Sequence, residues 1–127
     1  MLLLDENIVE SQVQLLRARR LAPRQIGGEV GRQGMKDDEI IPLLHSLRQP
    51  TFFTRDLRFY ERDAPHAGYC IVVLSVGQNE VASWVRRVLR HPQFDTQAKR
   101  MGKLLFVNQT SIVTKTLNVE EETTFSW

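Results

Sequence analysis

MLLLDEN (residues 1–7) opens the chain, placing three leucines directly before two carboxylates and an amide. An apolar run this short predicts a buried strand, and the acids that follow it then lie where that strand ends. In open α/β sheets, ligands bind outside the carboxyl ends of the strands. The stretch therefore predicts the first strand of a sheet and places Asp5 and Glu6 at the edge where a ligand site would form.

Two further stretches deliver acids to the same edge. Residues 51–54 (TFFT) form a second short apolar run, and Asp56 follows it closely. Asp37 begins an expected helix as its N-cap, and Asp38 and Glu39 suit the positive end of the helix dipole. Helix capping alone is the alternative explanation for this last group. Turn chemistry explains less easily why two separate strands should each end in an acid.

The spacing of apolar residues predicts alternating strands and helices. Asn7 is expected to cap the first helix, with Glu10 completing a capping box. Strands are expected over residues 2–4, 21–26, 51–54 and 69–76, and helices over residues 8–19, from residue 37, over 80–90 and over 94–101. Residues 104–107 and 111–116 are expected to form a hairpin, and residues 118–127 are a tail of uncertain structure. This order predicts an α/β fold: one domain over residues 1–117, with a mainly parallel central sheet flanked by helices and a C-terminal β-hairpin.

Composition restricts the class of protein further. The chain has 127 residues, of which 42% are hydrophobic, and its net charge is +2. These values predict one folded domain and name no partner by themselves. The single cysteine, Cys70, lies in an apolar run and is interpreted as a buried side chain, so no disulfide can form within the chain. No run approaches the length of a membrane span, and we expect a cytoplasmic protein without membrane partners.

Carboxylates that converge on one site favour a divalent metal. Neighbouring carboxylates repel each other, and Mg²⁺ or Mn²⁺ relieves that repulsion through oxygen ligands. A metal held in this way can activate water and stabilise charge on a phosphodiester oxygen. We therefore predict that Asp5, Asp37 and Asp56 are catalytic and bind metal together with Glu6 and Glu39. No pattern of His and Cys resembles a zinc site.

Three motifs of the chain resemble the short prokaryotic PIN-like proteins: LLDEN (residues 3–7), DDEI (residues 37–40), and Thr54-Arg55-Asp56 followed by Phe59. The resemblance covers most of the chain. It implies a PIN-like fold, a metal-dependent ribonuclease activity and membership of a toxin–antitoxin pair. It also implies that Asp5, Asp37 and Asp56 are the family's acids, with Asn7, Thr54 and Arg55 in supporting roles.

One position departs from the family's pattern. Arg58 stands where the family often has a second Asp. Loss of that carboxylate leaves open a second reading, in which the protein is a catalytically silent PIN-like module that binds RNA or protein. A receiver-like phosphate-handling domain is a weaker third alternative, because no suitable Lys follows a late strand.

The expected substrate is RNA, preferably single-stranded. Arg86, Arg87 and Arg90 gather near the end of an expected helix, where they suit the helix dipole and can also hold phosphates. We predict that they form a basic rim around the acidic pocket and bind RNA. Trp84, Phe59 and Tyr60 would offer stacking faces if they were exposed. A protein antitoxin and a homodimer are further expected partners.

Overall fold

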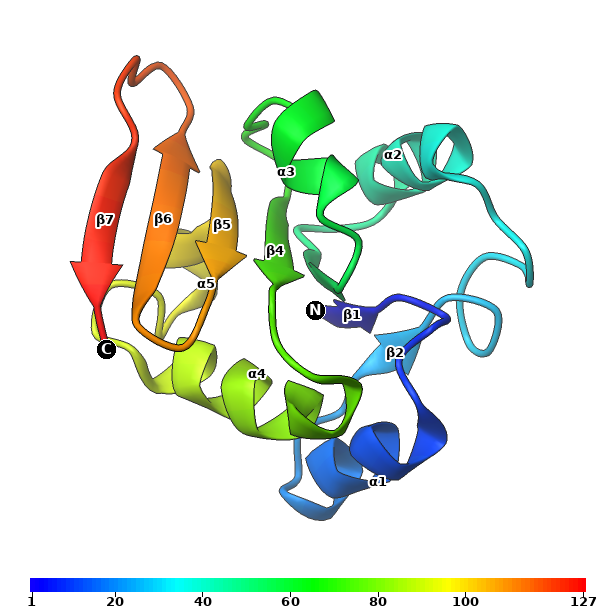
Figure 1. Ribbon diagram of the computed structural model, residues 1–127. Helices are drawn as coiled ribbons and strands as arrows, with labels where there is room; N and C mark the ends of the chain where they lie inside the picture. The colour runs from blue at the N-terminus through cyan, green and yellow to red at the C-terminus, as the bar shows by residue number, and fades with distance from the viewer.

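The computed structural model describes residues 1–127 and shows helices on both faces of one sheet (Figure 1). The strands are β1 (Leu2–Leu4), β2 (Arg24–Gln25), β3 (Thr51–Thr54), β4 (Cys70–Leu74), β5 (Lys103–Val107), β6 (Ser111–Thr116) and β7 (Thr123–Ser126). The helices are α1 (Glu10–Ala18), α2 (Asp37–Ser46), α3 (Arg58–Arg62), α4 (Val81–Arg90) and α5 (Gln97–Arg100), with a 3-10 turn, η1 (Gln78–Glu80).

The seven strands lie in the order β2-β1-β3-β4-β5-β6-β7. All pairings from β2 to β5 are parallel, whereas β6 pairs antiparallel with β5 and with β7. The predicted α/β class with a mainly parallel sheet is therefore confirmed. The chain leaves β1 toward β2 on one side and returns to β3 on the other, so β1 and β3 meet at a topological switch point, where such sheets bind ligands.

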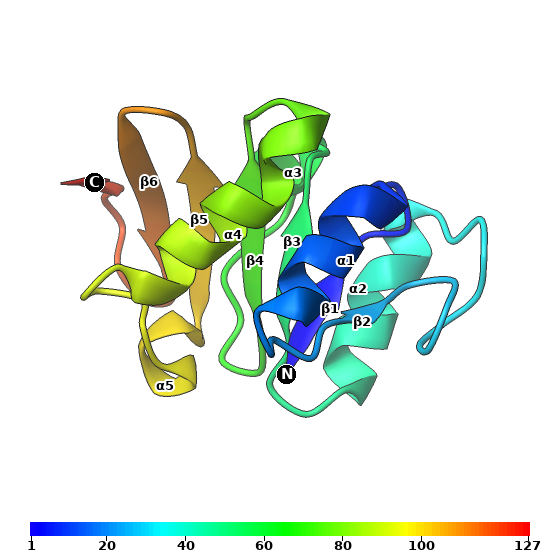
Figure 2. The same cartoon turned by 90° about the horizontal axis from the view of Figure 1, so that it is seen from below.

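Strand residues alternate between two apolar cores, one on each face of the sheet. Leu4 and Phe53 point to the core shared with α1 and α4, whereas Leu3 and Phe52 point to the core shared with α2 and α3. All four side chains are fully buried. Figure 2 shows α1 and α4 lying together across the first of these faces. The short β1 is thus fixed by packing on both faces, which also fixes the position of Asp5 at its end.

One crossover has the opposite hand to the others. The β1–α1–β2 and β4–α4–β5 connections cross the same face of the parallel strands but move along the sheet in opposite directions. The β2–α2–β3 and β3–α3–β4 connections cross the other face and share the hand of β1–α1–β2. Because about 98% of such crossovers are right-handed, β4–α4–β5 is the exception. It places α4 beside α1, on the face away from α2 and α3.

The helix caps differ from the sequence prediction. α1 begins at Glu10 with Val9 as its N-cap, so the predicted cap at Asn7 is wrong. The reason is a turn: the backbone N–H of Ile8 donates to the carbonyl of Asp5, and the side chain of Gln25 also binds that carbonyl. The turn delays the start of the helix. In α2 the cap is Lys36, so Asp37 is the first helical residue rather than the cap.

Three segments take a form that the sequence did not predict. β2 is only two residues long, and Arg58–Arg62 forms α3 in a region where the sequence predicts no helix. Part of the expected tail forms β7, which pairs with β6 and brings Trp127 against Trp84, with ring centroids 5.1 Å apart. None of the helices combines the length and the apolar character that a membrane span requires.

Candidate functional site

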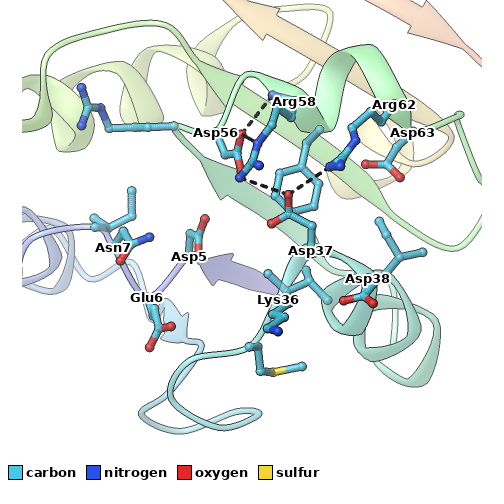
Figure 3. Close-up of a pocket in the computed structure, with 16 residues that line it drawn as sticks. Asp5, Glu6, Asn7, Lys36, Asp37, Asp38, Asp56, Arg58, Arg62 and Asp63 are labelled. Carbon is cyan, nitrogen blue, oxygen red and sulfur yellow. Dashed lines mark hydrogen bonds and ion pairs between the residues drawn. The ribbon is translucent and has the colours of Figure 1, made fainter.

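A pocket of about 950 Å³ opens at the carboxyl ends of β1 and β3, beside the first turn of α2. Asp5, Asp37 and Asp56 all line it, and Figure 3 shows their carboxylates facing the same space. Each comes from a different element: Asp5 follows β1, Asp37 begins α2 and Asp56 follows β3. The structure therefore brings together the three acids that were predicted to be catalytic.

A short chain of hydrogen bonds connects Asp5 to Asp56. The hydroxyl of Thr54 donates to Oδ2 of Asp5 at 2.7 Å, and the backbone N–H of Asp56 donates to that hydroxyl oxygen at 3.0 Å. Thr54 is fully buried as the last residue of β3. It orients the Asp5 carboxylate and fixes the turn that carries Asp56, which agrees with the supporting role predicted for it.

Asp5 is the buried acid of the pocket. Its exposed fraction is only 9%, and no basic side chain forms an ion pair with it. Burial raises the pKa of this carboxyl group, the nearby charges of Asp56 and Asp37 raise it further, and the hydrogen bond from Thr54 opposes the shift. The folded protein thus holds a carboxylate with too little positive charge around it.

Asp56 has the opposite environment, because Arg58 neutralises it. The Arg58 guanidinium donates from Nε to Oδ1 at 3.0 Å and from Nη2 to Oδ2 at 2.8 Å. The backbone N–H of Arg58 also donates to Oδ1. These contacts, the side-chain hydrogen bond first, lower the pKa of Asp56. A bidentate pair of this kind is the strongest form of Arg–carboxylate contact.

The same guanidinium reaches Asp37. Nη2 of Arg58 lies 3.4 Å from Oδ2 of Asp37, and Nη1 of Arg62 lies 3.6 Å from the same oxygen. Arg58 therefore bridges two of the three acids, as the dashed lines in Figure 3 show. Its side chain is 63% exposed, so it can swing into solvent without breaking any core packing.

Three other predicted residues have different surroundings. Glu6 borders the pocket, but its Oε1 accepts the backbone N–H of Gly34 at 2.8 Å and so closes the loop between β2 and α2. Glu39 does not line the pocket, because it pairs with Arg32 and with the backbone N–H of Lys36. Asn7 lines the pocket and is exposed. A direct metal contact from Glu39 is therefore not supported by its position.

The predicted basic rim is made of different residues. Arg86, Arg87 and Arg90 lie on α4, and none of them lines the pocket. The guanidinium of Arg87 contacts two indole rings: its Cζ lies 4.3 Å from the ring centre of Trp84 and 4.9 Å from that of Trp127. The prediction that these arginines surround the pocket is wrong, because α4 lies on the other face of the sheet. The basic side chains that do line it are Lys36, Arg55, Arg58 and Arg62.

The predicted stacking faces are not available either. Trp84 and Phe59 are 7% and 2% exposed, because each packs into one of the two apolar cores. Tyr60 is half-buried, and the Nζ of Lys115 lies 4.3 Å from its ring centre. The structure therefore leaves neither the Trp84 ring nor the Phe59 ring free to stack on a base.

Comparisons with protein-family models, curated proteins and solved structures found no match for this chain. The chemistry of the pocket therefore has to be inferred from the residues that line it.

The donor set fits a divalent metal in chemistry but not in its present arrangement. Carboxylate oxygens are the ligands that Mg²⁺ and Mn²⁺ prefer, and the under-neutralised Asp5 favours a nearby cation. Yet no group of three or more His, Cys, Asp or Glu side chains is arranged to hold a metal ion. The Arg58 guanidinium pairs with both Asp56 and Asp37. Binding by all three acids requires the exposed Arg58 side chain to move away.

One arginine of the site, Arg62, was missed by sequence reasoning. It lines the pocket together with Arg58, Asp38 and Asp63. Arg58 and Arg62 are four residues apart, which would have placed them on one face if α3 had been recognised. Burial raises the pKa of Asp63, and the charge of Arg62 opposes that shift. The pocket thus holds more charges of both signs than the motifs alone indicate.

The raised pKa of Asp5 predicts an unusual pH dependence. The folded state keeps the proton to a higher pH than the unfolded chain does, so the Asp5 contribution to stability falls as pH rises from the unfolded to the folded pKa. We expect Asp5→Asn to remove this loss and to raise the free energy of unfolding at neutral pH by about 1 kcal/mol. Urea unfolding of both proteins from about pH 4, the pKa of an ordinary Asp, up to about pH 8 measures it.

Asp38→Asn is the matched control for this experiment. Asp38 lines the same pocket but is exposed and lies in the first turn of α2, where a negative charge stabilises the helix. This variant should leave stability unchanged or lower it by up to about 0.5 kcal/mol. Equal effects of the two substitutions would show that burial of Asp5 does not govern the pH dependence.

Proposed function

We propose that the protein is a PIN-like, metal-dependent endoribonuclease. The observation that carries this proposal is the convergence of Asp5, Asp37 and Asp56, from three separate elements, on one pocket at the switch point of the sheet. The burial of Asp5 without a basic partner supports it, because a bound cation would remove the cost of that charge. The antiparallel strands that close the sheet also agree with a PIN-like fold.

The residues of the pocket divide into three roles in this proposal. Asp5, Asp37 and Asp56 would hold Mg²⁺ or Mn²⁺, and Thr54 orients Asp5 toward the shared space. A metal bound there supplies the activated water and the charge stabilisation that phosphodiester hydrolysis needs. Lys36, Arg55 and Arg62 are placed to hold phosphate oxygens beside the acids.

An RNA substrate follows from the mixture of charges in the pocket. Phosphodiesters need cations to bind them, and hydrolysis at neutral pH needs a site that can generate hydroxide. Six carboxylates and four basic side chains line the same space. We place this activity in the cytoplasm, where the RNA substrate lies, and we retain a protein antitoxin as its expected regulator. Homodimer formation stays a prediction.

A second function is favoured by one specific observation, the Arg58 bridge. Arg58 neutralises Asp56 and also contacts Asp37. A site whose acids are already paired can bind RNA through its remaining basic groups and leave it uncut. In this alternative the protein is a catalytically silent PIN-like module that binds RNA or another protein.

A ribonuclease assay on mixed single-stranded RNAs, with Mn²⁺ and with EDTA, tests the two functions against each other. The enzyme should cut RNA with Mn²⁺ and leave it intact with EDTA. RNA that is retained in a filter-binding assay but never cut, with either additive, would support the silent module. A protein that neither cuts nor binds RNA would contradict the nuclease and the RNA-binding module, and would leave only a module that binds another protein.

A further inference from the structure

A second, smaller hollow adjoins the acidic pocket along the carboxyl edge of the sheet. Its volume is about 370 Å³, and it is lined by residues that follow β3 and β4 and by Gln109 from the β5–β6 turn. Arg55 lines both hollows, so it lies on the boundary between them. A ligand that extends beyond the acids in this direction must pass Arg55.

The Arg55 guanidinium is held in place by a hydrogen bond but forms no ion pair. Its Nε donates to the carbonyl oxygen of Val76 at 3.0 Å, which anchors the group at the end of β4. Arg58 and Arg62, the other arginines of the pocket, are paired with Asp37 or Asp56, whereas Arg55 has no carboxylate partner. Its two terminal nitrogens therefore keep their donors for a ligand. An anchored guanidinium with free donors is suited to bind phosphate.

The smaller hollow has the surface character that a nucleotide needs. Leu57 is 45% exposed there and offers an apolar contact for a base. Ser75 and Gln109 are exposed polar side chains that can form hydrogen bonds with a sugar or a base edge. The side chain of Leu74 contributes to the lining and is buried, so the wall of the hollow is fixed by the core.

We propose that Arg55 binds the phosphodiester that joins two neighbouring nucleotides of the RNA strand. One nucleotide lies beside the acids, and the next lies in the hollow lined by Leu57, Ser75 and Gln109. This inference rests on the proposed RNA substrate and adds the direction in which the strand leaves the acids. It makes Arg55 a residue that selects a chain of nucleotides over a single nucleotide.

The test measures binding of a fluorescein-labelled oligouridine of eight nucleotides and of uridine monophosphate, in EDTA so that no RNA is cut. Arg55→Gln should weaken oligouridine binding about tenfold. It should also make the negative slope of log affinity against log salt less steep by about 0.7, the value for one phosphate contact on a single strand. Binding of uridine, a third ligand that has no phosphate, should change little, whereas uridine monophosphate offers its single phosphate to Arg55 and should lose part of its affinity. Arg55→Lys should restore the salt slope and part of the affinity.

Arg48→Gln is the matched control, since Arg48 is exposed, lies between α2 and β3 at the opposite edge of the sheet, and lines neither hollow. It removes the same charge and should leave the affinity and the salt slope close to wild type. If wild-type protein binds oligouridine and the two variants behave alike, the role of Arg55 is wrong while the proposed function stands. If wild-type protein binds no oligouridine, this inference fails, whereas the proposed function is decided separately by the cleavage of mixed RNAs with Mn²⁺.

Discussion

Asp56→Asn protein is expected to lose Mn²⁺-dependent cleavage of RNA by roughly a hundredfold or more. The substitution removes a charged oxygen from the three acids that line the pocket. Residues that only orient a metal ligand cost about 10- to 100-fold when they are lost, so loss of a ligand itself should cost at least as much. The measurement is the rate of cleavage of a single RNA at saturating Mn²⁺.

The fold should survive this substitution. The amide oxygen of Asn can still accept the backbone N–H of Arg58, and the backbone N–H of residue 56 still reaches the hydroxyl of Thr54. Circular dichroism and the melting temperature should therefore stay close to wild type. A loss of activity that accompanies unfolding would say nothing of catalysis, so both measurements belong to the experiment.

Asp95→Asn is the matched control. Asp95 also pairs with a basic side chain, since the Nζ of Lys99 lies 2.8 Å from its Oδ1, but it is remote from the pocket. It should keep wild-type cleavage. Equal rates for Asp56→Asn and wild type, both sensitive to EDTA, would remove Asp56 from the site and with it the metal centre proposed here.

The position of the three acids was predictable because it depends on short-range patterns. Leu3 and Leu4 before Asp5, and two phenylalanines in the run before Asp56, are buried on both faces of a parallel sheet, and such strands are near-continuous apolar runs. The ends of parallel neighbours must meet at one edge. The core packing that fixes β1 and β3 therefore also fixes the site, and the sequence carries both signals together.

The Arg58 bridge was not predictable, because it depends on a helix with weak signals. α3 spans only five residues, and its cap, Leu57, makes no side-chain hydrogen bond. Without knowledge of that helix, Arg58 is only a basic residue near Asp56, at a position where the family often has an acid. The helix turns its guanidinium back onto Asp56 and brings Arg62 to Asp37. Motif comparison could note the residue but not its contacts.

Glu39 and the arginines of α4 were wrongly placed at the pocket for a different reason, whereas Glu6 lines the pocket with one of its oxygens engaged elsewhere. Proximity in sequence to a catalytic acid does not specify the direction of a side chain. Glu6 is drawn to the backbone of Gly34, and Glu39 to Arg32 and the start of its own helix. The arginines of α4 lie on the face of the sheet away from α2 and α3, because the β4–α4–β5 crossover has the opposite hand to the others. No residue pattern predicts that hand.

Arg58 gives the second prediction with a large expected effect: its removal should strengthen metal binding. Its guanidinium now neutralises Asp56 and contacts Asp37, so a divalent cation must displace it. We expect Arg58→Gln to tighten Mn²⁺ binding by up to roughly fivefold, the scale of an exposed ion pair of about 1 kcal/mol. Isothermal titration calorimetry with Mn²⁺ and no RNA measures this directly, independently of cleavage.

Arg62→Gln is the control for Arg58→Gln, because Arg62 lies on the same helix and contacts only Asp37, at 3.6 Å. It removes an equal charge from the same pocket while leaving the Asp56 pair intact, so it should change Mn²⁺ binding by less than Arg58→Gln does. Looser Mn²⁺ binding in Arg58→Gln would instead mean that Arg58 helps to organise the acids.

Arg58→Asp carries the argument one step further, because it places a fourth carboxylate beside Asp56 and Asp37. Without metal these charges repel, so the melting temperature in EDTA should fall below that of Arg58→Gln. Mn²⁺ should raise it again by more than it raises wild type, since a ligand that binds only the folded state stabilises in proportion to its affinity. If wild-type protein is the silent module, this variant should gain cleavage. If wild-type protein is the nuclease, Arg58→Asp should instead be active at a lower Mn²⁺ concentration than wild type. The two proposed functions therefore predict different effects of this substitution on the rate of cleavage.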